Sequence, residues 1–294
     1  MAEEAEVGPR FLLNGEEVFQ YGVLDQGWWP DGLYTPPSEE ALASDILKAK
    51  DFGFNLIRKH AKVEPDRFYH LCDKLGMLVW QDMPSASGMK YMWSPDGAHD
   101  YMEGEKAPPL ASSFVRELQG VVRGLRNHPS IVAWIPFNEG WGQFDSAAIF
   151  EWLARADPDR MHWVSGGNDF GLGHALDRHV YPGPASVRPE SGRASVLGEF
   201  GGNGFAISGH TWQGGNYESF TQWGYPQVES LVALEDLYAS QVRDLRALAS
   251  QEGLAAAIFT QLTDVECEVN GLVTYDRKHT KIENLSAMNA VLYT

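Results

Sequence analysis

The chain has 294 residues, of which 44% are hydrophobic and 21% are charged, so a sizeable core is expected and wholesale disorder is excluded. Acidic residues outnumber basic residues by 40 to 23, which gives a formal net charge of −17. A field of this sign repels nucleic-acid phosphates and anionic membrane surfaces. No apolar run approaches the roughly 18 residues of a membrane-spanning helix. We therefore expect neither a nucleic-acid nor a membrane partner.

The beginning of the chain and its cysteines bear on the compartment. Residues 1–10 are acidic and polar, unlike the basic and apolar regions of a secretion signal, and we expect them to form a disordered or extended tail. Cys72 and Cys267 are too few for a disulfide framework. These features predict a cytoplasmic protein, although a chain trimmed from a secreted parent would look the same.

Strand and helix signals alternate along residues 11–294. The predicted strands are 18–23, 54–58, 77–82, 131–138, 161–165, 179–181, 195–200 and 255–261. One predicted helix has Ser38 as its N-cap, and another, 66–75, ends at Gly76, a residue typical of helix ends. Further helices are predicted over 114–125, 146–156, 231–248 and 281–292.

This alternation predicts the fold class. Strands that alternate with helices pair in parallel through right-handed crossovers, and eight such units fit a single-domain (β/α)8 TIM barrel over residues 11–294. A doubly wound sheet is the alternative, but it usually carries a Gly-rich phosphate-binding turn after its first strand, which is absent here. In a barrel, functional residues lie at the carboxyl ends of the strands.

Polar side chains occupy the predicted strand ends. They are Asp25, Arg58, His60, Asp82, Asn138, Glu139, His179, Tyr181, Glu199 and Gln261. Glu139 and Glu199 follow apolar strands on opposite walls of the predicted barrel, and two carboxyl groups that flank one bond are the minimum equipment for glycoside hydrolysis. A neutral Glu can protonate the leaving oxygen while an ionised Glu attacks the anomeric carbon, with Arg58 as the nearest cationic partner. For either Glu alone, a solvated loop position is the alternative.

Other residues have two interpretations each. Ten Trp residues indicate either a large core or a cleft lined with flat rings that suit sugar faces. Among the Trp residues of the predicted rim loops (Trp28, Trp29, Trp93, Trp141 and Trp212), we favour Trp141 as a stacking platform because it follows Glu139 closely. His179 and Tyr181 either contact sugar or form a core pair, and Asp25 and Asp82 either bind sugar hydroxyls or cap loops. Glu266 and Glu268 are expected to be solvated.

Several segments together resemble the catalytic barrel of glycoside hydrolase family 2, the group of β-galactosidases, β-glucuronidases and β-mannosidases. The segments are 11–19 (FLLNGEEVF), 53–60 (GFNLIRKH), 67–73 (RFYHLCD), 76–80 (GMLVW) and 127–131 (NHPSI), the last preceding Asn138 and Glu139. The resemblance implies Glu139 as acid/base, Glu199 as nucleophile and Asn138 as partner of the sugar 2-hydroxyl. Arg58 would contact the nucleophile. The implied reaction is retaining hydrolysis of a terminal β-linked sugar, β-galactosidase-like, without a cofactor.

The chain also departs from the family pattern. The family's β-sandwich domains usually precede the barrel, so this chain is expected to be either a minimal barrel or a fragment. In the family, the second strand often reads Arg-x-x-His-Tyr-Pro, where this chain has Arg58-Lys-His60-Ala61. The last strand of the family often carries a Trp, where residues 259–262 of this chain read Phe-Thr-Gln-Leu. The choice of sugar therefore does not follow from the resemblance.

Two alternative functions remain open at this stage. One is a catalytically weak or silent carbohydrate-binding barrel that lacks the sandwich domains, and the other is a metal-dependent hydrolase. The second is disfavoured because the sequence has no His-Glu-x-x-His motif, EF-hand loop or Cys pair at ligand spacing, so we expect no metal. The expected partner is a small carbohydrate or glycoside, and a homodimer formed through exposed apolar surface is possible.

Overall fold

The computed structural model describes residues 8–85, 108–212, 225 and 227–293. Eight parallel strands form one sheet: β3 (Gln20–Asp25), β4 (Leu56–Lys59), β5 (Leu78–Asp82), β6 (Ile131–Asn138), β7 (Met161–Ser165), β8 (Ala175–Val180), β9 (Ala194–Gly201) and β10 (Leu254–Thr260). The helices are α1 (Glu39–Asp51), α2 (Asp66–Leu75), α3 (Pro108–Leu125), α4 (Ser146–Ala156), α5 (Leu231–Gln251) and α6 (Leu285–Asn289), the last continued by a 3-10 turn over Ala290–Tyr293. Two short strands, β1 (Leu12–Leu13) and β2 (Glu16–Glu17), form a separate antiparallel hairpin.

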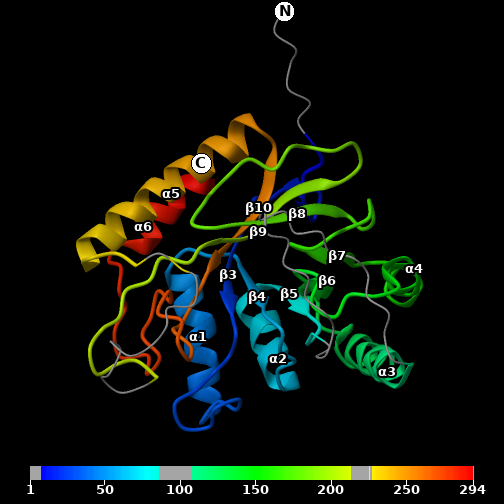
Figure 1. Cartoon of the computed structure of the whole chain (residues 1–294), viewed down its shortest axis with the longest axis horizontal. Coiled ribbons are helices and arrows are strands. Elements are labelled where there is room, and N and C mark those ends of the chain that lie inside the picture. The colour runs from blue at the N-terminus through cyan, green and yellow to red at the C-terminus, as the bar shows by residue number, and fades with distance from the viewer. Residues whose placement is uncertain (1–7, 86–107, 213–224, 226, 294) are drawn as a thin grey trace, which may run out of the picture.

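The sheet curls into a nearly closed barrel. The strands follow the order β7-β6-β5-β4-β3-β10-β9-β8, and helices surround them (Figure 1). At the seam between β7 and β8, the His174 amide donates to the His162 carbonyl at 3.0 Å. The predicted TIM barrel is confirmed, and the doubly wound alternative is wrong. Within the described ranges, no helix is both long and apolar enough to cross a membrane.

The interior of the barrel follows the two-residue period of its strands. Leu24, Leu56, Trp80, Trp163 and Ile258 belong to an inner apolar cluster, while neighbouring strand residues belong to the larger cluster that packs against the helices. The Trp80 and Trp163 rings meet edge to face at 4.7 Å. Several of the Trp residues are therefore core residues. Arg58 lies on the same inward face, two residues after Leu56.

Phe11 closes the inner cluster from the amino-terminal side. Its ring packs against the Trp80 and Trp163 rings, with centroids 6.5 and 6.3 Å away. Just before it, within the segment expected to be a tail, Arg10 donates from Nη2 to the Ala249 carbonyl at 2.8 Å. Residues 1–7 lie outside the described residues.

The helix boundaries agree with their sequence signals except at two starts. Helix α3 begins at Pro108, before the predicted residue 114, and the last helix begins late. The Ser38 side chain accepts from the Ala41 amide, and Gly76 ends α2 in the left-handed conformation with φ 67°, as predicted. The helix predicted over 281–292 is wrong at its start, because α6 begins only at Leu285. The reason is Lys281, whose backbone amide bonds to Leu272 and whose side chain pairs with buried Asp264.

The N-cap of α1 gives a stability prediction. Ser38→Ala removes the acceptor for the Ala41 amide and should lower the free energy of unfolding by about 1 kcal/mol. Ser44→Ala, an exposed position within the same helix, is the matched control and should cost nothing measurable. Urea denaturation measures both variants. Equal losses in the two variants would show that the cap contributes nothing.

Candidate active site

Arg58 is the centre of a buried polar cluster at the carboxyl end of the barrel. Its guanidinium donates to both Asp82 oxygens at 2.9 and 3.1 Å, to Glu199 Oε1 at 2.9 Å and to Asn138 Oδ1 at 2.7 Å. Burial disfavours its charge, but the Asp82 and Glu199 carboxylates outweigh this and raise the pKa of Arg58. One side chain from β4 thus fixes polar groups from β5, β6 and β9.

Asp82 supports this cluster from β5. Besides Arg58, its carboxylate contacts His60 Nδ1 at 2.8 Å. Burial would raise the pKa of Asp82, but the Arg58 charge and the His60 hydrogen bond lower it. Its oxygens are thus engaged by protein groups, and Asp82 orients Arg58 and His60.

Glu199 is held from two sides. Its Oε1 accepts from Arg58, and its Oε2 accepts from the Tyr181 hydroxyl at 2.5 Å. The residue before it must be glycine, because a Cβ on Gly198 would lie 2.2 Å from Asp177 Oδ1. Asp177 in turn accepts from the Gly198 amide at 2.8 Å, which fixes the backbone just before Glu199.

Glu139 follows the last residue of β6. Its φ of 50° is unusual for a residue with a Cβ, and its amide bonds to the Ser165 carbonyl at 2.8 Å. Its Oε1 lies 2.8 Å from His179 Nδ1. Burial would raise the pKa of Glu139, but the hydrogen bond and charge of His179 lower it to about 2.

His179 lies between the two glutamates. Its Nδ1 is 2.8 Å from Glu139 and 3.5 Å from Glu199, and its Nε2 contacts the Ser165 hydroxyl at 2.9 Å. Burial lowers the pKa of His179, but the two carboxylates outweigh this effect and raise it. The low pKa of Glu139 and the raised pKa of His179 both favour a proton on the imidazole rather than on the carboxyl group.

The two glutamates lie close together. One oxygen of each carboxylate and a ring nitrogen of His179 all lie within 4.8 Å of one another. Among the described residues these three atoms also have the spacing of a metal site, yet hydrogen bonds already engage them. Carboxyl groups about 5–5.5 Å apart are typical of retaining glycosidases, whereas inverting enzymes need about 6.5–9.5 Å. The two carboxylates are therefore close enough for both to reach one bond of a ligand.

Two tyrosines complete the wall beside Glu199. Tyr181 lies 3.1 Å from Thr260 Oγ1, and its ring meets Tyr225 edge to face at 4.9 Å. Burial, followed by the Glu199 charge, raises the pKa of Tyr181, so its hydroxyl stays protonated and donates. Sequence reasoning missed Tyr225, because nothing distinguishes it within a long loop rich in Gly and Trp.

The loop after β10 adds a further carboxyl group. Gln261 is buried, and its amide donates to Glu268 Oε2 at 2.6 Å and to Asn270 Oδ1 at 2.9 Å. Burial raises the pKa of Glu268 to about 7 against the opposing effects of His60 and Gln261. The expectation that Glu268 is solvated is wrong, because a short hairpin turns it toward Gln261, while Glu266 is exposed as expected.

The remaining predicted residues lie at the rim or outside the cluster. Asp25 is buried and accepts from Lys59 Nζ at 2.8 Å and from the Gly27 amide at 2.9 Å, so its carboxylate is engaged within the protein. Trp141 is 41% exposed, which leaves part of its ring available to a ligand. Trp93 lies outside the described residues.

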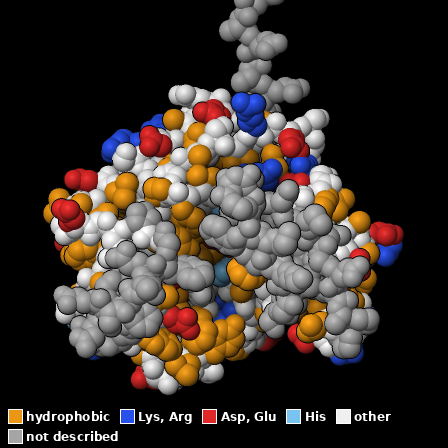
Figure 2. Space-filling model, in the orientation of Figure 1, with side chains coloured by type: hydrophobic (Ala, Val, Ile, Leu, Met, Phe, Trp, Pro, Cys, Tyr) orange, Lys and Arg blue, Asp and Glu red, His pale blue; other side chains and the backbone are white. Residues whose placement is uncertain are grey.

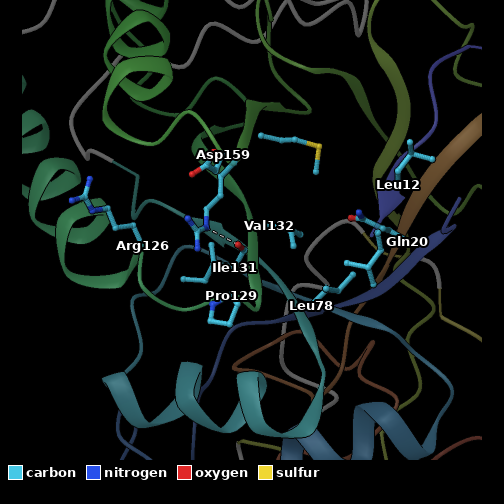
Figure 3. Close-up of a pocket in the computed structure, with 11 residues that line it drawn as sticks. Leu12, Gln20, Leu78, Arg126, Pro129, Ile131, Val132 and Asp159 are labelled. Atoms are coloured by element: carbon cyan, nitrogen blue, oxygen red, sulfur yellow. Dashed lines mark hydrogen bonds between the residues drawn. The ribbon is translucent and has the colours of Figure 1, made fainter. Parts of the chain in front are cut away.

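A large hollow elsewhere on the molecule is not this site. It measures about 550 Å³ and lies among the first residues of the strands, including Gln20, Leu78 and Ile131 (Figure 3). The parallel sheet puts these residues at the opposite end of the barrel from Glu139 and Glu199. On the face shown in Figure 2, Asp and Glu side chains are dispersed rather than gathered in one patch.

Comparison with known proteins places this geometry in a family. The model described as "Glycosyl hydrolases family 2, TIM barrel domain" matches residues 10–179. The chain belongs to glycoside hydrolase family 2. The family 2 resemblance of the sequence is thereby confirmed.

Curated relatives of this family 2 barrel include differently named enzymes. "Beta-mannosidase B" of Aspergillus clavatus is 31% identical over 212 residues, which cover 71% of this chain and 21% of that protein. "Beta-galactosidase" of Lactococcus lactis is 30% identical over 162 residues, which cover 55% of this chain and 15% of that protein. The chain thus spans only about a fifth or less of the length of either relative.

Solved structures share the barrel fold. The β-glucuronidase of Parabacteroides merdae has a TM-score of 0.67 at 18% identity, covering 95% of this chain and 39% of that chain. A family 2 β-galacturonidase from Eisenbergiella tayi, bound to galacturonate, has a TM-score of 0.68 at 19% identity, covering 97% of this chain and 53% of that chain. At these identities the likeness concerns the fold alone.

The buried cluster of this family 2 barrel gives a second stability prediction. Arg58→Ala leaves the Asp82 and Glu199 carboxylates buried without their cation and should lower the free energy of unfolding by about 3–5 kcal/mol. Arg155→Ala, which breaks an exposed pair with Glu151, is the control and should change little. Chemical denaturation compares the two. A loss at Arg58 no larger than at Arg155 would contradict the central role of Arg58.

Proposed function

We propose that this barrel is the catalytic domain of a retaining exo-β-glycosidase that releases a terminal β-linked sugar. The observation that supports this most is the closeness of Glu139 and Glu199, of which only Glu199 is held by Arg58 and Tyr181. Both donors fix the position of the Glu199 carboxylate, which suits a nucleophile. The neighbouring Glu139 is then the acid/base.

The proposed reaction has two steps. Glu199 Oε attacks the anomeric carbon while the bond to the leaving oxygen breaks, and Glu139 delivers a proton to that oxygen. Water then attacks the glycosyl–enzyme ester, Glu139 takes a proton from this water, and Glu199 leaves as carboxylate. The Oδ1 of Asn138 is engaged by Arg58, which directs its amide nitrogen toward the sugar 2-hydroxyl.

The proton for the first step is stored in the Glu139–His179 pair. His179 holds it at Nδ1 before the reaction, 2.8 Å from the oxygen of Glu139 that needs it. As the leaving oxygen gains negative charge, the proton passes from His179 through Glu139 to that oxygen. The pair therefore titrates as a unit, and its macroscopic pKa belongs to neither residue alone.

For the released sugar we propose a terminal β-linked galactose, in keeping with the curated β-galactosidase from Lactococcus lactis. A second candidate function is a carbohydrate-binding barrel with weak or no activity. The low pKa of Glu139 favours it, because a carboxylate ionised at neutral pH is a poor acid unless His179 supplies the proton. The two experiments below separate these functions.

Replacing each glutamate should give a different loss. Glu199→Ala should abolish turnover of an aryl β-glycoside, and added azide should restore part of it by taking the place of the carboxylate. Glu139→Gln should lower kcat by roughly 10²–10⁴ for poor leaving groups and by less for nitrophenolate, which needs no proton. Steady-state kinetics measures both. Near-normal activity of Glu199→Ala, or a wild-type protein that binds sugar without turnover, would contradict the proposal.

The pH dependence of kcat/KM tests whether the Glu139–His179 pair holds the catalytic proton. In the wild type the alkaline limb of kcat/KM should lie above 6.5, because the proton leaves His179, whose pKa is raised from that value. In His179→Asn the proton must sit on Glu139 alone, whose pKa rises without the cation, so the alkaline limb should move away from its wild-type position. His174→Asn, at the other end of β8, is the control. If the alkaline limb of kcat/KM lies at the same pH in His179→Asn as in the wild type, His179 does not hold the proton.

A further inference from the structure

Glu268 lies in the wall of the proposed sugar site, linked to the nucleophile by a continuous chain of contacts. Its Oε2 accepts from Gln261, the residue that follows Thr260 at the end of β10. Thr260 Oγ1 lies 3.1 Å from the Tyr181 hydroxyl, and this hydroxyl donates to Glu199. The electrostatic influence of His60 and Glu199 on Glu268 agrees with this placement.

The position of Glu268 is fixed by its surroundings. Its backbone amide and carbonyl both bond to Val265, at 2.8 and 3.0 Å, which closes a tight hairpin. Gln26, from the end of β3, donates to Gln261 Oε1 at 3.0 Å and reaches Glu268 Oε2 at 3.5 Å. In the described contacts, Glu268 Oε1 and Gln26 Oε1 have no partner. Both are acceptors, so this wall favours ligand groups that donate, such as sugar hydroxyls.

The cations around the site are already engaged. Arg58 is bound to Asp82, Glu199 and Asn138. Lys59 is bound to the Asp25 and Glu64 carboxylates at 2.8 and 2.6 Å. For the part of the chain that the structure describes, the proposed site thus offers a sugar carboxylate no free Lys or Arg. Above its pKa of about 7, Glu268 would face such a carboxylate with the same charge.

We propose that Glu268 restricts this site to neutral sugars and rejects uronic acids, with Gln26 and Glu268 accepting hydrogen bonds from the hydroxyls of the terminal sugar. This inference rests on the proposed glycosidase function and narrows its substrate class. It separates this chain from the β-glucuronidase and β-galacturonidase that share its fold. The physical cause is repulsion between the ionised Glu268 and the sugar carboxylate in a partly buried site, where solvent screens weakly. The repulsion therefore acts above the pKa of Glu268, about 7, and weakens below it.

The test compares matched nitrophenyl substrates. At about pH 9, where Glu268 with its pKa of about 7 is ionised, wild-type kcat/KM for a β-glucuronide and a β-galacturonide should be roughly 100-fold below that for the matching glucoside and galactoside, and this difference should shrink as the pH falls toward 7. Glu268→Gln removes the charge and keeps the shape of the side chain. It should reduce the ratio of kcat/KM for the neutral glycoside to kcat/KM for the uronide at least about tenfold. Glu266→Gln, an exposed position on the same hairpin, is the control and should leave the ratio within about twofold.

A second variant guards against a folding defect in Glu268→Gln. Gln26→Lys keeps the Glu268 carboxylate but places an ammonium group beside it. It should also reduce the ratio of kcat/KM for the neutral glycoside to kcat/KM for the uronide. Wild-type preference for uronides, an unchanged ratio in both variants, or equal narrowing in Glu266→Gln would overturn the role of Glu268.

Binding measurements separate this inference from the proposed function. Calorimetric titration of the unmodified chain with galactose and with galacturonate needs no turnover. If no glycoside is hydrolysed but galactose binds and galacturonate does not, the glycosidase proposal fails and the selectivity of the site stands. If galacturonate binds as well as galactose, or neither binds, the inference fails.

Discussion

The site depends on one buried cation. Arg58 projects into the barrel, where its five N–H groups meet Asp82, Asn138, Glu199 and the Gly198 carbonyl. A guanidinium in such surroundings is stable only while its anionic partners stay ionised and in place, and the partners need it equally. The same interaction therefore orders the end of the barrel and positions the carboxylate that serves as nucleophile in the proposed mechanism. Stability and the proposed chemistry cannot be separated at this residue.

A second constraint concerns the proton. A glycosidase acid must be protonated before the reaction, yet Glu139 is surrounded by charges that favour its ionised form. His179 resolves this conflict, because it contacts both glutamates and can hold the proton that Glu139 must deliver. The arrangement differs from an acid whose pKa is raised by burial alone. It makes the proposed activity depend on the pair rather than on one residue.

The sequence was informative where a residue's role follows from local pattern. Strand β6, helix α4 and the caps at Ser38 and Gly76 agree with expectation, because period and capping chemistry are local properties. Several of the polar residues predicted at the strand ends do lie together there, in the cluster around Arg58. Glu268 and Tyr225 did not emerge, because their position depends on how long loops fold back over the strands. The predicted start of the last helix was wrong for a related reason. Lys281 forms a buried ion pair with Asp264, a residue well before it in the sequence, and this contact outweighs helical periodicity.

The stereochemistry of hydrolysis tests the central claim most directly. Proton NMR can identify the first anomer released from an aryl β-glycoside before mutarotation mixes the two forms. Two carboxylates this close, with Glu199 fixed by Arg58, leave no room for a water beneath the sugar, so the account predicts release of the β-anomer. Release of the α-anomer as the first product would contradict it.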